Sequence, residues 1–95
     1  MVRYLVRIEL YKADADKYNS LHDNMVTLGF SQTIGDSAGS NLKLPHGTYT
    51  GISYLPPHEL MMKVRSIAGL LSDGEPSVMV VALSKDNWAA SLNPE

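Results

Sequence analysis

Two side chains suited to proton transfer, Glu9 and His58, lie at points where regular structure begins or ends. Glu9 closes a stretch in which apolar and polar residues alternate, and His58 follows Pro56 and Pro57. A carboxylate and an imidazole both exchange protons near neutral pH, so the pair is a candidate for acid–base catalysis. The alternative is that His58 and its neighbour Glu59 are simply exposed residues of a first helical turn, with no catalytic role.

Other catalytic and metal-binding motifs fail on spacing. His22, His46 and His58 do not show zinc spacing, and Asp14-Ala15-Asp16 begins like a calcium loop but places Tyr18 at the next ligand position. The segment 35–40 lacks the lysine of a phosphate-binding loop, and the chain has no cysteine. We therefore expect neither a metal nor a cofactor.

The elements that must position these residues follow from periodicity. Strict alternation over residues 2–10 predicts a strand with one buried face. Asp14 can cap a helix over 14–28, whose stripe is Tyr18, Leu21, Met25 and Leu28, and Gly29 ends it. Strands are predicted at 30–34, 48–54 and 77–84, a polar loop at 35–46, and a second helix after Pro57 with the stripe Leu60, Val64, Ile67 and Leu71.

The order β-α-β-β-α-β predicts an α+β, ferredoxin-like sandwich, with both helices on one face of a four-stranded antiparallel sheet. Residues 1–84 form the single domain, and 85–95 form a C-terminal tail. We expect the first and third strands to be central and parallel, and the fourth to lie at an edge. That arrangement would bring Glu9, Asp14 and His58 to the same rim.

The sheet face opposite the helices is a candidate surface for single-stranded RNA. Arg3, Arg7 and Glu9 point to it from the first strand, and Tyr49 is expected there from the third. Sheets of this fold stack RNA bases on aromatic rings, although the standard RNA-recognition signature is missing because Thr48 follows Gly47. The alternative is a solvated face with weak ion pairs.

The fourth strand is apolar on both faces, which is unusual for an edge open to water. Val78, Val80 and Ala82 alternate with Met79, Val81 and Leu83. Two explanations remain open: a homodimer formed through this edge, or the tail folded back onto it with Trp88 as its anchor.

Composition narrows the class of partner. The 95 residues are 44% apolar and 19% charged, with a net charge of −2, which is typical of an ordinary globular domain. Such a charge gives no general attraction to RNA, to DNA or to anionic membranes, so any nucleic-acid activity must depend on a local patch. Neither a secretory signal nor an apolar run long enough to span a bilayer is visible. The lack of cysteine favours a cytoplasmic location.

Three segments resemble the GhoS family of small endoribonuclease antitoxins of type V toxin–antitoxin systems. They are Tyr4-Leu-Val-Arg-Ile-Glu-Leu, Tyr18-Asn-Ser-Leu-His-Asp-Asn-Met-Val-Thr-Leu-Gly-Phe30 and Leu44-Pro-His-Gly-Thr-Tyr49. The resemblance implies a ferredoxin-like fold related to the small CRISPR-associated nucleases, and cleavage of the messenger RNA of a partner toxin. By position, Glu9 stands where those nucleases have an aspartate, and His22 where the family has an arginine.

Two functions from different classes follow. The first is a metal-independent endoribonuclease that cleaves single-stranded RNA by attack of the ribose 2′-hydroxyl, with Glu9, His22 and His58 as catalytic candidates and Arg3, Arg7 and Tyr49 as RNA-binding candidates. The second is a non-catalytic ferredoxin-like module that dimerises and binds a protein or small ligand. The resemblance favours the first, whereas the acidic balance and the apolar fourth strand favour the second.

Overall fold

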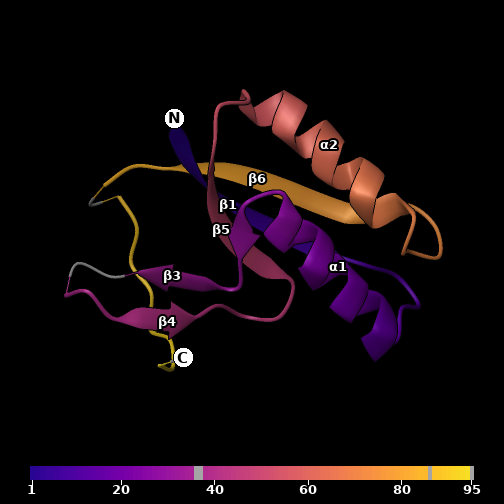
Figure 1. Ribbon diagram of the computed structural model, residues 1–95, viewed down its shortest axis with the longest axis horizontal. Helices are drawn as coiled ribbons and strands as arrows, with labels where there is room; N and C mark the ends of the chain where they lie inside the picture. Colours follow the sequence, from indigo (N-terminus) through magenta and orange to yellow (C-terminus); the bar gives the residue numbers. More distant parts are fainter. Residues whose placement is uncertain (36–37, 86, 95) are drawn as a thin grey trace.

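The chain alternates strands and helices in the computed structural model, which describes residues 1–35, 38–85 and 87–94. β1 (Val2–Glu9) leads into α1 (Ala15–Thr27). Three short strands follow, β2 (Phe30–Ser31), β3 (Thr33–Gly35) and β4 (Asn41–Lys43). The order is completed by β5 (Thr48–Ser53), α2 (Pro57–Gly69) and β6 (Ser77–Leu83) (Figure 1).

Local chemistry explains where both helices begin. The Asp14 carboxylate accepts a hydrogen bond of 2.9 Å from the Lys17 backbone N–H, which satisfies one of the free donors of the first turn of α1. Pro57 opens α2, at a position where an N–H is not needed. The predicted cap and the predicted proline start are both confirmed.

The main sheet has four antiparallel strands in the order β2-β5-β1-β6. The mixed α+β class and the edge position of β6 are confirmed, but the prediction that the two central strands are parallel was wrong. β1 and β5 run in opposite directions, with Val2 opposite Ser53 and Arg7 opposite Thr48. The reason is that a crossover helix makes β1 parallel to β2, and the connection from β2 to β5 then reverses the chain.

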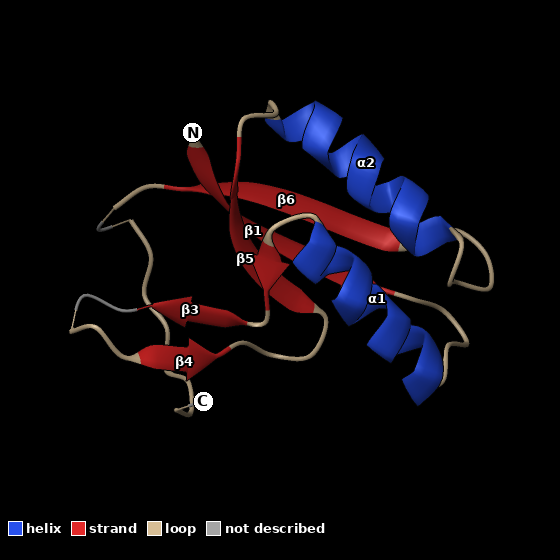
Figure 2. Ribbon diagram, viewed as in Figure 1, coloured by secondary structure: helices blue, strands red, loops and turns tan. Residues whose placement is uncertain are grey.

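The predicted second strand and the loop after it also differ from the structure. The strand breaks at Gln32 into β2 and β3, and β3 pairs with β4 inside the predicted loop, forming a separate two-stranded sheet (Figure 2). Thr50 donates a 2.6 Å hydrogen bond to the Thr33 carbonyl, so the hairpin lies against β5. The C-terminal tail reaches the same hairpin, where the Lys43 N–H donates to the Asn93 carbonyl at 2.9 Å.

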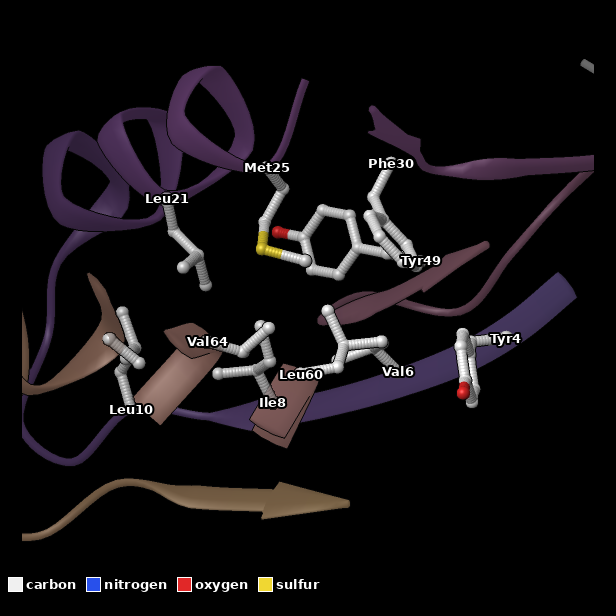
Figure 3. Packing of buried hydrophobic residues seen from close by; sticks show 11 residues of the cluster. Tyr4, Val6, Ile8, Leu10, Leu21, Met25, Phe30, Tyr49, Leu60 and Val64 are labelled. Atoms are coloured by element: carbon white, nitrogen blue, oxygen red, sulfur yellow. The ribbon is translucent and has the colours of Figure 1, made fainter. Parts of the chain in front are cut away.

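The core lies between the sheet and the two helices (Figure 3). Its fully buried members come from β1, α1, β2, β5 and α2, and the largest are Tyr4, Val6, Ile8, Leu21, Met25, Phe30, Tyr49, Leu60 and Val64. Because the three β1 residues alternate along the strand, they share one face, and both helices pack against that face. Each such side chain contributes about 1.5–3 kcal/mol of burial free energy.

The opposite face of the sheet, which we call the outer face, carries the polar and exposed positions of the same strands. Arg3, Arg7 and Glu9 are exposed there on β1. Ile52 of β5 and Met79 and Val81 of β6 are 52%, 55% and 41% exposed. Thr48 and Thr50 lie on the outer face as well, yet they are almost fully buried. The outer face is therefore covered near the β3–β4 hairpin and open near β6.

Candidate functional site

A cluster of polar aromatic side chains gathers where β5 begins. β2 pairs only with Thr50 and Gly51, so the first two residues of β5 lie beyond the end of the β2–β5 ladder. The base of the β3–β4 hairpin closes this gap, since the Leu44 N–H donates a 2.8 Å hydrogen bond to the Gln32 carbonyl. We call this place the histidine corner; its members are Tyr18, His22, Gln32, His46 and Tyr49.

His22 is held on both sides of its ring. Its Nδ1 shares a hydrogen bond with the Tyr49 hydroxyl, which Figure 3 shows directed from β5 towards α1. Its Nε2 lies 3.3 Å from the amide nitrogen of Gln32. The ring of His22 is half-buried, so these two contacts fix its orientation while leaving one edge of it near solvent.

His46 lies beside His22 and is exposed. The two imidazole centroids are 5.8 Å apart and the rings meet edge to face at 87°. The ring of Tyr18 lies 4.4 Å from that of His46, and the Tyr18 hydroxyl accepts a 3.0 Å hydrogen bond from the Leu10 N–H. One protected and one accessible imidazole therefore share a rigid aromatic frame.

The turn that carries His46 is fixed by close backbone contacts with β1. The Ile8 N–H donates a 2.7 Å hydrogen bond to the Gly47 carbonyl, and Arg7 Nη1 donates one of 2.6 Å to the His46 carbonyl. Gly47 has φ +79°, and a Cβ atom built there would collide with the Ile8 carbonyl oxygen and Arg7 Nη1. Glycine is therefore required at position 47, and the turn brings a guanidinium next to the histidine corner.

The surroundings of the corner favour neutral side chains. Burial lowers the pKa of His22, the neighbouring His46 lowers it further, and Asp23 opposes the change. Burial, with Tyr18 as the second cause, raises the pKa of Tyr49 well above its usual range. His22 is thus mainly the unprotonated base at neutral pH, next to a phenol that keeps its proton.

The structure separates two of the residues predicted to act together. Because β1 and β5 are antiparallel, the start of α2 lies beside the start of β1, so His58 is at the opposite end of the sheet from Glu9. Both side chains are exposed. The prediction that His58 shares a rim with Glu9 and Asp14 was wrong, for the same reason as the prediction of parallel strands.

Tyr49 also lies on a different face from the one expected. It is opposite Val6 in the register and has no exposed surface, so it points into the core rather than to the outer face. A buried ring offers no surface on which a base could stack, whereas Arg3 and Arg7 are on the outer face as predicted.

Sequence reasoning missed His46 and Gln32. The signal for His46 was the Pro45-His46-Gly47 turn just before a strand, combined with a strand antiparallel to β1 that would place this turn beside Arg7. Gln32 had no such signal, because its position depends on the break between β2 and β3.

In the part of the chain that the structure describes, no three His, Asp or Glu side chains come close enough together to hold a metal ion. None of the described helices has the length and apolar character needed to cross a membrane.

Comparison with known proteins identifies a family for this chain. No curated protein gives a significant match to the sequence. The family model described as endoribonuclease GhoS, however, matches residues 1–90, which is nearly the whole chain and includes every member of the histidine corner. The chain belongs to the endoribonuclease GhoS family.

Proposed function

We propose that this protein is an endoribonuclease antitoxin that cleaves the single-stranded messenger RNA of a partner toxin without a metal ion, at the histidine corner. The observation that carries the proposal is the placement of His22 and His46 side by side, with Arg7 attached to the same turn. Two imidazoles and a guanidinium supply a base, an acid and a positive charge, the three groups that RNA cleavage through its own 2′-hydroxyl requires.

The proposed reaction is a transfer of the phosphate within the RNA. His22 takes the proton of a ribose 2′-hydroxyl, and the 2′-oxygen forms a bond to the adjacent phosphorus. The bond from phosphorus to the 5′-oxygen of the next nucleotide breaks, and His46 donates a proton to that oxygen. The products are a 2′,3′-cyclic phosphate and a free 5′-hydroxyl. His22 has gained one proton and His46 has lost one.

The two histidines receive these roles from their environments. The lowered pKa of His22 keeps it unprotonated at neutral pH. In the proposed step its Nδ1–H donates to the Tyr49 hydroxyl oxygen, so Nε2 carries the free lone pair and is the reacting nitrogen. The weaker 3.3 Å contact of Nε2 with Gln32 is the one that a substrate hydroxyl replaces. His46 is exposed, as is appropriate for a group that reaches a leaving oxygen in a bound polymer.

Single-stranded RNA suits this surface better than a duplex. The attacking 2′-oxygen, the phosphorus and the leaving oxygen must become collinear, which an unpaired ribose can reach and a stacked A-form helix restrains. Arg7 would bind the scissile phosphate and stabilise its additional charge, and Arg3, four residues away on β1, would bind another phosphate of the same RNA strand. Glu9 and His58 have no part in the proposed step.

The test uses a labelled single-stranded RNA in excess chelator, with wild type, His22→Ala, His46→Ala and Glu9→Gln. We expect wild type to cut the RNA, to leave 2′,3′-cyclic ends, and to spare an RNA whose cut position carries 2′-deoxyribose. Both histidine variants should lose most of the activity while Glu9→Gln keeps it. Cleavage that chelator abolishes, or that persists in His46→Ala, would overturn the proposal.

We also propose that the fold is a ferredoxin-like sandwich with the β3–β4 hairpin inserted between its second and third main strands. The order β2-β5-β1-β6 and the packing of both helices on one face support this description.

A second candidate function is self-association through β6, independent of catalysis. It is favoured by the position of β6 at the sheet edge and by the exposure of Met79 and Val81 on its outer side. The pairing of two such edges would bury uncharged residues against each other. Light scattering should then give a dimer for wild type and a monomer for Val81→Lys; a monomeric wild type would contradict this function.

A further inference from the structure

A hollow lies on the outer face, away from the histidine corner. Its volume is about 380 Å³, within the range of ligand pockets in proteins. It is bounded by β5, by β2 and by the β3–β4 hairpin, and its lining includes Arg3, Thr33, Asn41, Thr50 and Ile52. We call it the hairpin cavity.

The lining of the hairpin cavity has the chemistry of a nucleotide site. A Cβ atom added at Gly29 would meet nothing within 4 Å, and one added at Gly35 would meet Asn41 Oδ1 at 3.8 Å, so the backbone at these two lining residues is open to a ligand. Four of the other lining residues carry a hydroxyl or an amide. Arg3 is the charged side chain among its lining residues, and it lies directly opposite Ile52 in the register of β1 and β5. A cation next to hydrogen-bonding groups and one apolar side chain matches a phosphate, a ribose and the face of a base.

The hairpin cavity and the histidine corner are joined by one strand face and by one hairpin. Arg7, attached to the corner, and Arg3, in the cavity, are four residues apart on the same face of β1, about 13 Å along the strand. The hairpin reaches the corner through Gln32 at its base, and it lines the cavity through Gly35 and Asn41. A ligand that occupies both places must be a chain of several nucleotides.

We propose that the hairpin cavity is a binding subsite for a nucleotide of single-stranded RNA, remote from the scissile phosphate, and that Arg3 binds its phosphate. This inference rests on the proposed function, because it assumes that RNA is cut at the histidine corner. It adds a length requirement: the enzyme distinguishes RNAs that reach from the corner to the cavity from those that do not.

The first test measures binding without cleavage. The probe is a fluorescent 12-nucleotide single strand of 2′-O-methyl RNA, which lacks the attacking hydroxyl, and binding is followed by anisotropy over a range of salt concentrations. Arg3→Ala should weaken binding about tenfold and reduce the slope of log affinity against log salt by about 0.7, the value for one lost phosphate contact on a single strand. Lys63→Ala, which removes an exposed cation from α2, should change neither.

A second pair of variants changes the cavity itself. Ile52 is 52% exposed, so glutamate or glutamine at this position should leave the fold intact. Ile52→Glu places a negative charge beside the phosphate, whereas Ile52→Gln has the same size without the charge. We expect the glutamate variant to bind the 12-mer at least fivefold more weakly than the glutamine variant.

The final test compares a dinucleotide with a 12-nucleotide RNA as substrate. Arg3→Ala should lower kcat/KM for the long substrate at least fivefold more than for the short one. Equal losses for both substrates, or an unchanged salt slope, would overturn the subsite. Failure of the histidine corner gives a different result, because His46→Ala would then cut both substrates while the binding differences of Arg3→Ala and Ile52→Glu remained.

Discussion

The two ends of β5 are alike in sequence and different in structure. Each is flanked by a histidine that follows a proline, His46 before the strand and His58 after it. Each also lies near a buried tyrosine that makes one hydrogen bond, Tyr49 to His22 at the start and Tyr4 to the Leu55 carbonyl at the end. Among the residues that the structure describes, these groups contact other side chains that exchange protons at the start of β5 and not at its end.

The difference arises from what covers each end. At the start, the base of the β3–β4 hairpin and the tight turn at Gly47 hold His46 against Tyr18 and beside His22. At the end, the chain passes through Pro56 directly into α2, and His58 is exposed in the first turn. A histidine therefore becomes a candidate for catalysis through the groups packed around it, and matched pairs of variants at the two ends of β5 can test each of these groups.

The largest effect is expected from removing the side chain of His46, and the removal of His58 is its control. His46→Ala should lower the rate of RNA cleavage by about 10²–10⁴, the usual contribution of a general acid or base. His58→Ala should leave the rate unchanged, because His58 lies at the other end of the sheet. Single-turnover cleavage of a labelled RNA measures both, and equal losses in the two variants would mean that the corner is not the site.

A smaller effect is expected from adding a side chain at Gly47. Gly47→Ala adds a Cβ that collides with the Ile8 carbonyl and Arg7, so the turn must move and His46 must move with it. Gly74→Ala is the matched control, since Gly74 has a similar positive φ of +100° but nothing within 4 Å of the added atom. Backbone strain should cost each variant about 1–3 kcal/mol of stability, and the collision at position 47 should make Gly47→Ala the less stable of the two.

Only Gly47→Ala should also lose cleavage activity, by at least tenfold under conditions where both variants remain folded. Urea unfolding gives the stability and single-turnover kinetics the rate. An active Gly47→Ala variant would show that the position of His46 does not matter.

The two ends of β5 also differ in how far the sequence alone could predict them. Alternation in β1, the Asp14 cap and the proline start of α2 are local signals, and they correctly predicted β1, the two helices and the buried face of β1. The direction of β5 depends instead on the paths of two connections, the one from β1 to β2 and the one from β2 to β5. No local sequence pattern indicates these paths. Once β5 was assigned the wrong direction, Glu9 and His58 were placed together and His46 was overlooked.

The hairpin was unpredictable for a related reason. Residues 35–46 have the composition of a loop, and β3 and β4 are three residues each, too short for alternation to be recognised. Their pairing depends on contacts with β5 and with the tail, such as the bond from Thr50 to the Thr33 carbonyl. The face of Tyr49 followed from the register, which is also a property of the assembled sheet.

The cleavage rate should fall moderately when Tyr49 is replaced by phenylalanine and should not fall when Tyr4 is. Tyr49→Phe removes the hydroxyl that orients His22, and the loss of a hydrogen bond of about 1 kcal/mol corresponds to about a fivefold slower cleavage. Tyr4→Phe removes a similar bond, of 2.8 Å to the Leu55 carbonyl, and should lower stability by about 1 kcal/mol without slowing cleavage. Comparable rates for the two variants would indicate that Tyr49 serves only the core.

The smallest effect is a dependence of stability on pH that His22 causes. Because burial and His46 lower the pKa of His22 below 6.5, the folded protein binds fewer protons at this position than the unfolded chain does. The stabilising contribution is therefore complete above pH 6.5 and is lost as the pH falls through that value towards the folded pKa. Cleavage should decline on the same side, since protonated His22 is no longer a base.

Thermal unfolding at pH 7.5 and 5.5 measures this dependence. The drop in unfolding temperature should be smaller in His22→Asn than in wild type, because the variant has no group whose protonation opposes folding at this position. His58→Asn, which removes a histidine from the other end of β5, should keep the wild-type drop. If His22→Asn and His58→Asn respond alike, the buried environment of His22 does not govern its protonation, and its assignment as the base loses its support.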